Sequence, residues 1–80
     1  MPTVATLLGL RVVIYPNDHP PRHIHVMDAE HEARFALDDG GAVTLMENYG
    51  FRRRRLEAIR AELEARREAL IAEWVRIHGQ

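Results

Sequence analysis

Two patterns in this chain of 80 residues predict an α+β fold. Up to residue 46, short runs of β-branched and aromatic residues alternate with polar residues and are separated by turn residues. From residue 51 or 52 onward, apolar residues recur at helical spacing. We therefore expect a single domain, residues 1–80, in which a small antiparallel sheet of three to four strands is followed by one long C-terminal helix packed on the apolar face of the sheet.

Turn residues mark the ends of the expected strands. The run RVVIYP stops at Pro16, which lacks the N–H that a central strand needs. Two alternating segments flank a short turn at Glu30–His31 and predict an antiparallel hairpin. The segment DDGG at 38–41 is a further turn signal. The strands are thus expected at residues 11–16, 23–29, 32–38 and 42–46.

The register of the expected hairpin follows from its apolar residues. If Ala29 faces Glu32, the apolar side chains of both strands form one continuous face. The expected pairs are Val26 with Phe35 and Ile24 with Leu37 on the apolar face, and His25 with Ala36, His23 with Asp38 and Met27 with Arg34 on the other. This register predicts that both histidines point away from the apolar side.

The C-terminal segment has one apolar stripe that ends before Gly79. A straight helix of roughly 25 residues would be about 38 Å long and would extend past a small sheet. Its far end is therefore expected either to project toward a partner or to bend near Arg66–Arg67. The stripe is formed by Leu56, Ile59, Leu63, Leu70, Trp74 and Ile77.

Composition limits the classes of function. The chain has no cysteine, which excludes disulfides and thiolate metal sites. The N-terminal segment resembles neither a signal peptide nor a membrane span, so a cytoplasmic protein is expected. Residues 1–50 contain three Arg and seven acidic residues, whereas residues 51–80 contain eight Arg and five Glu. The Arg52–Arg55 run suits an anionic ligand or partner, although a solvated helix face is the simpler interpretation.

Three of the five histidines lie close together in NDHPPRHIHV, residues 17–26. Alternation places His23 and His25 on one strand face about 6.5 to 7 Å apart. His19 and Asp18 come from the preceding turn, where a carboxylate can orient an imidazole. These residues are either ordinary turn and surface residues, a metal site, or a metal-free acid/base site. In the metal site, His19, His23 and His25 would bind a divalent ion such as Zn²⁺.

The motif D-H-x-P-x-H-x-H-V at 18–26 resembles the small bacterial family called domain of unknown function 4160. The opening MPT, the aliphatic strand ending in Tyr15, E-A at 32–33 and E-W at 73–74 extend the resemblance over nearly the whole chain. Members usually read D-H-x-P-P-H-F-H, so Arg22 and Ile24 replace the second Pro and the Phe here. This difference leaves the ionisable groups intact.

The resemblance implies the toxin of a type II toxin–antitoxin pair, with ribonuclease as the expected activity. The expected mechanism needs no cofactor: His23 or His25 takes the proton of the 2'-hydroxyl, and His19, held by Asp18, protonates the leaving oxygen. Arg22 or Arg34 would stabilise the phosphate in the transition state. The expected partners are RNA and a cognate antitoxin protein, with no membrane, and an oligomer is possible. The alternatives are a His-ligated metal domain and a non-enzymatic module that only binds a protein.

Overall fold

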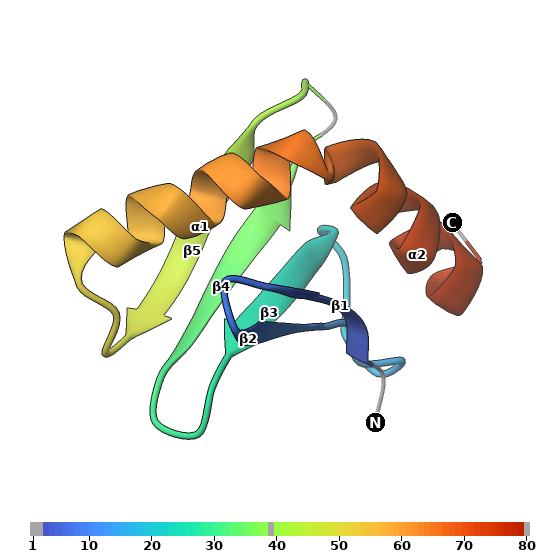
Figure 1. Cartoon of the computed structure of the whole chain (residues 1–80). Coiled ribbons are helices and arrows are strands. Elements are labelled where there is room, and N and C mark those ends of the chain that lie inside the picture. Colours follow the sequence, from blue (N-terminus) through green and yellow to red (C-terminus); the bar gives the residue numbers. More distant parts are fainter. Residues whose placement is uncertain (1–2, 39, 80) are drawn as a thin grey trace.

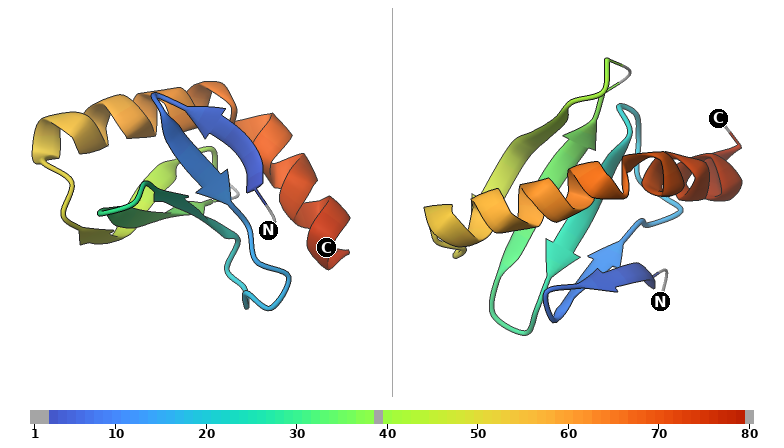
Figure 2. Two further views of the ribbon diagram at one scale, coloured as in Figure 1. Left: turned by 60° about the horizontal axis from the view of Figure 1, so that its bottom comes forward. Right: turned by 45° about the horizontal axis from the view of Figure 1, so that its top comes forward.

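The computed structural model describes residues 3–38 and 40–79 as five strands followed by two helices (Figure 1). The strands pair in chain order as one antiparallel sheet, β1-β2-β3-β4-β5. Helix α1 runs across one face of this sheet, and α2 continues at an angle to it past the end of the strands (Figure 2). The elements are β1 (Thr3–Leu7), β2 (Leu10–Val13), β3 (His23–Met27), β4 (Glu32–Leu37), β5 (Val43–Tyr49), α1 (Arg53–Ala65) and α2 (Arg67–His78).

The α+β class is confirmed, but the prediction of three to four strands is wrong because β1 adds a fifth. A two-residue turn joins β1 to β2, and both of its residues have positive φ, 50° at Leu8 and 75° at Gly9. Such a turn matches the twist of two antiparallel strands. The turn is usually made by Asn-Gly or Asp-Gly, so Leu-Gly does not signal it in the sequence.

The prediction of one long helix is also wrong, because the helical segment breaks at Arg66. The backbone there leaves the helical region, with φ −111° and ψ 13°. The break coincides with Arg66–Arg67, where a bend is one of the two outcomes expected for the far end of the helix. A straight helix of about 38 Å would exceed the longest dimension of the molecule, 33 Å. The change of direction instead brings Leu70 and Trp74 of α2 into the core, each 2% exposed.

The hairpin β3–β4 has a register two residues away from the predicted one. Met27, not Ala29, faces Glu32. Asp28 explains the difference, because its carboxylate accepts hydrogen bonds of 2.8 Å from the N–H groups of Glu30 and His31 and so closes the turn earlier. A shift of two residues keeps every side chain on its predicted face. The observed pairs are His23 with Ala36, Ile24 with Phe35, His25 with Arg34 and Val26 with Ala33.

The core lies between the sheet and the two helices. All five strands and both helices contribute to it, and α1 supplies the fully buried Ile59 and Leu63. The expected turn at 38–41 includes Asp39, which lies outside the described residues. Neither helix in the described part of the chain is long and apolar enough to cross a membrane.

The Asp28 turn predicts a pH dependence. The N–H of Glu30, followed by the N–H and ring of His31, holds the pKa of the Asp28 carboxyl below its ordinary value of 3.8. A lowered pKa stabilises the fold above pH 3.8, and this contribution disappears as the pH falls through the folded pKa. Carbon-13 titration of Asp28 should give a midpoint below 3.8. Asp28→Ala should melt at a lower temperature than wild type at pH 7, with a smaller difference in acid.

Glu30→Gln is the matched control for this turn, because it changes an exposed neighbouring side chain and keeps the backbone donor. Its melting temperature at pH 7 should stay close to that of the wild type. A midpoint for Asp28 at or above its ordinary value would contradict the role given to the turn hydrogen bonds.

Candidate metal centre

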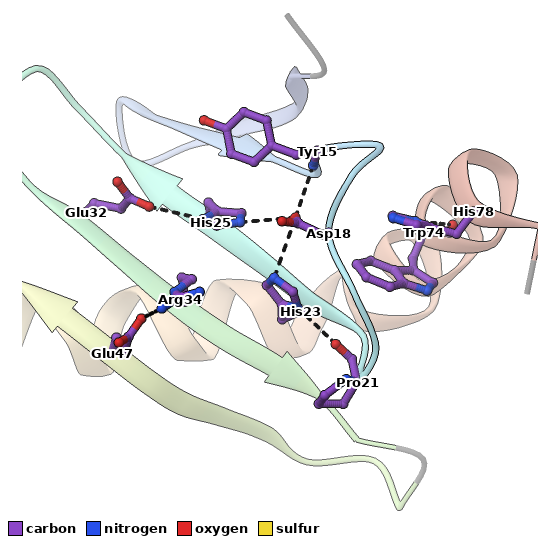
Figure 3. A network of polar contacts seen from close by, with 10 residues as sticks. All are labelled: Tyr15, Asp18, Pro21, His23, His25, Glu32, Arg34, Glu47, Trp74 and His78. Carbon is purple, nitrogen blue, oxygen red and sulfur yellow. Dashed lines mark hydrogen bonds and ion pairs between the residues drawn. The ribbon is translucent and has the colours of Figure 1, made fainter.

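His23 and His25 lie on the face of the sheet opposite to α1, which we call the outer face (Figure 3). Their neighbours Ile24 and Val26 point into the core and are fully buried. The two histidines are themselves buried, with only 6% and 7% of their surface exposed. Buried polar rings require partners for their nitrogens, and those partners decide what the rings can do.

Asp18 reaches the two rings from the loop between β2 and β3 (Figure 3). A tight turn holds it, because its N–H donates to the carbonyl of Tyr15 at 3.0 Å and its Oδ2 accepts from the N–H of Tyr15 at 3.2 Å. The same Oδ2 lies 3.1 Å from Nε2 of His25 and 3.5 Å from Nε2 of His23. One carboxylate oxygen therefore faces two imidazole nitrogens.

The other nitrogen of each ring is also engaged. Nδ1 of His23 donates to the carbonyl of Pro21 at 2.9 Å, and Nδ1 of His25 lies 3.0 Å from Oε2 of Glu32. A carbonyl only accepts, so Nδ1 of His23 must carry the proton. A neutral His23 then presents a lone pair from Nε2 toward the carboxylate of Asp18.

This arrangement leaves acceptors facing one another unless a positive species intervenes. Both nitrogens of His25 face carboxylate oxygens, and a neutral imidazole has only one N–H to offer. Nε2 of His23 and Oδ2 of Asp18 are likewise two acceptors when the ring is neutral. A proton on the rings or a cation between the three groups satisfies them. The cluster is thus built for positive charge.

Aromatic side chains enclose the two rings. The ring of Tyr15 meets His25 edge-on at 4.9 Å between centroids, and the indole of Trp74 lies 5.5 Å from the ring of His23. Trp74 belongs to α2, so the break at Arg66 also sets one wall of the cluster. Packing on both sides limits the rotation of the imidazoles and keeps their Nε2 atoms directed at Asp18.

The three groups fit a divalent transition metal. Their nearest ligand atoms, from Asp18, His23 and His25, all lie within 4.8 Å of one another. A tetrahedral ion with bonds of about 2.0–2.1 Å separates its ligand atoms by about 3.3 Å, and the two distances from Oδ2, 3.1 and 3.5 Å, lie on either side of that value. Metal-binding histidines usually donate their other N–H to a carbonyl or carboxylate, and Pro21 and Glu32 provide both kinds of acceptor.

Comparison with protein families matches residues 9–75 with domain of unknown function 4160. The chain belongs to this family. The matched segment contains Asp18, His23, His25 and Trp74, so every wall and ligand of the cluster lies within the region that defines the family. No curated protein and no solved structure matches the chain. The description of the family names no activity.

The other predicted site residues of this family member lie around the cluster rather than in it. His19 is exposed and is not part of the ligand group found among the described residues. Nε of Arg22 donates to the carbonyl of Leu37 at the long distance of 3.5 Å. Arg34 is the direct cross-strand partner of His25 and forms an ion pair with Glu47. Of the two arginines, Arg34 therefore stands beside a histidine of the cluster on the outer face.

Glu32 and Trp74 contribute to the cluster and were not predicted to do so. Glu32 reaches His25 only in the observed register, because the predicted one paired it with Ala29. Trp74 was expected in the apolar stripe, and its contact with His23 depends on the helix break. A sequence prediction with the correct hairpin register would have placed Glu32 next to His25. No local pattern in the sequence signals the contact between Trp74 and His23.

The hydrogen bond to Pro21 predicts the tautomer of His23. Long-range proton–nitrogen spectra of the chelator-treated protein should show a proton on Nδ1 of His23, either alone or together with one on Nε2. A neutral ring protonated only at Nε2 would contradict the geometry. The exposed His19 ring provides the reference for an imidazole without such a constraint.

Proposed function

We propose that the chain binds one divalent transition metal through Oδ2 of Asp18 and Nε2 of His23 and His25, and that this centre serves hydrolysis. The observation that carries the proposal is the convergence of these three atoms while Pro21 and Glu32 hold the far sides of both rings. Two imidazoles and one carboxylate suit Zn²⁺, Fe²⁺ or Mn²⁺ better than Ca²⁺ or Mg²⁺.

The residues at and beside the proposed centre have distinct roles. A divalent ion would supply Lewis acidity and activate water, and three protein ligands leave positions for water and substrate. Asp18 offsets part of the positive charge and Glu32 orients His25. Glu32 is 41% exposed at its side chain, so it can also exchange protons with solvent. Arg34, 34% exposed, lies beside His25 and would bind an anionic substrate group in competition with its ion-pair partner Glu47.

RNA is the substrate that the family resemblance implied, and ribonuclease activity and a toxin role remain predictions. So do a cognate antitoxin and a cytoplasmic location. For the mechanism, we favour the metal over the metal-free alternative. A metal-free acid and base act on opposite sides of a phosphate, whereas both Nε2 atoms here face one carboxylate oxygen. Asp18 takes the place that His19 held in the expected ligand set.

Metal binding can be measured directly, because the only tryptophan lies against a proposed ligand ring. Titration of the chelator-treated protein with Zn²⁺, Mn²⁺ or Ni²⁺ should show one site by calorimetry, and Ni²⁺ should quench the fluorescence of Trp74. His23→Ala, His25→Ala and Asp18→Asn should lose this site. Glu32→Gln should weaken it by about 10- to 100-fold, as is typical for a residue that orients a ligand.

His19→Ala is the matched control for metal binding, because it removes a neighbouring histidine that lies outside the ligand group. It should bind like the wild type. If His19→Ala lost the site and Asp18→Asn kept it, His19 and not Asp18 would be the third ligand. A wild type that binds no stoichiometric metal would refute the metal centre.

Ribonuclease activity is tested separately on a labelled single-stranded RNA. The metal-loaded wild type should cleave it, and cleavage should stop with chelator and in the His23→Ala, His25→Ala double variant. Induced expression should then arrest bacterial growth for the wild type but not for an equally soluble double variant. Cleavage that resists chelator yet needs both histidines would favour the metal-free mechanism. Metal binding without cleavage would support the metal centre but refute RNA as its substrate.

A further inference from the structure

Strand β5 forms one edge of the sheet and pairs only with β4 among the described residues. It is the longest of the five strands, with seven residues. Three of its large side chains are exposed, Leu45 at 41%, Met46 at 42% and Tyr49 at 58%. An edge strand has unpaired backbone N–H and C=O groups on its free side, which can pair with another extended chain.

An apolar hollow lies next to this edge, between β5 and α1. Its volume is about 190 Å³. The buried Phe35, the exposed Leu45 and Leu56 line it together with charged side chains of α1. The lining residues are Phe35, Leu45, Arg53, Leu56, Glu57 and Arg60. An edge strand beside a helix with an apolar hollow between them is the arrangement that receives an added peptide strand in several recognition domains.

Strand β5 carries few of the features that protect an edge from pairing. It contains no Pro, a residue that commonly blocks such edges. The register shifts between Arg34 and Phe35, so Met46 forms a bulge, and Glu47 is bound to Arg34 across the sheet. The bulge twists the strand locally, but the exposed Leu45 stays next to the hollow.

The charge around the hollow selects the kind of partner. Residues 52–60 contain five Arg and one Glu. All four residues of the Arg52–Arg55 run are exposed. Glu57 pairs with Arg53 at 3.5 Å and Glu64 pairs with Arg60 at 2.9 Å, so an acidic partner would compete with these two glutamates. This excess of positive charge attracts an acidic partner and repels a basic one.

We infer that the free edge of β5 and the hollow beside α1 receive an acidic, extended segment of another protein as a sixth strand of the sheet. Apolar side chains at alternate positions of that segment would enter the hollow, and its carboxylates would meet Arg53 and Arg60. A second copy of this chain fits less well, because it would bring the same positive residues 52–60 to the interface. RNA suits the charge but has no peptide backbone to pair with the edge.

The inference is tested with the full chain and a defined probe. The probe is an eight-residue peptide that alternates acidic residues with Val and Leu, and its counterpart carries Lys in place of every acid. Nitrogen-15 spectra should show that the acidic peptide shifts residues 43–49 and 53–60, while the Lys peptide does not. Leu45→Gln, which replaces an apolar side chain of the hollow with an uncharged polar one, should weaken binding of the acidic peptide by about tenfold or more, and so should the double variant Arg53→Glu, Arg60→Glu.

Matched controls lie on α2. Val75→Gln makes the same kind of change at an apolar side chain that is 39% exposed, and Arg76→Glu reverses a charge away from β5. Both should bind the peptide like the wild type. Each of three outcomes would overturn the inference: no shifts in residues 43–49, a concentration-dependent dimer through β5, or stronger binding of single-stranded RNA than of the acidic peptide at these residues.

Discussion

The arrangement of the side chains on the outer face depends on the contacts of the Asp18 carboxylate. Its Oδ2 faces both Nε2 atoms and accepts the N–H of Tyr15. Charged and polar groups in a nearly closed site are costly unless they are paired. The contacts of Asp18 therefore hold the β2–β3 loop against the sheet and hold the two rings in place. Without that carboxylate, the histidines would be two buried rings with no common partner.

The core and the outer-face cluster share one side chain, Trp74. Its indole is 2% exposed and packs in the apolar core, yet it also lies 5.5 Å from the ring of His23. This double contact exists because the chain leaves the helical conformation at Arg66, so that α2 turns past the end of the strands. The position of a histidine in the cluster is thus coupled to the packing of the second helix.

The uneven charge of the chain corresponds to two separate surfaces. The acidic first part of the sequence contributes Asp18 and Glu32, which surround the histidines and create a demand for positive charge. The arginine-rich second part places the Arg52–Arg55 run at the start of α1, where Arg53 lines the hollow beside Leu45 of β5. One surface is suited to a small cation and the other to an acidic chain. Their opposite charges nearly cancel, so the total charge of the chain indicates neither surface.

The sequence by itself determined the features that follow from local backbone geometry. Alternation in a strand placed His23 and His25 on one face away from the apolar residues, and helical spacing marked the stripe that contains Ile59, Leu63 and Trp74. It predicted the hairpin of β3 and β4 but not its register, because a turn closed by Asp28 moved the register by two residues and brought Glu32 to His25. It also did not predict β1, which the Leu8–Gly9 turn adds. The sequence named Asp18 as a carboxylate that orients a histidine, but only the tertiary structure placed Asp18 instead of His19 in one group with His23 and His25, because convergence depends on how the loop and α2 pack around the sheet. Contacts between distant segments are set by the packing of the whole chain, and no short sequence pattern encodes them.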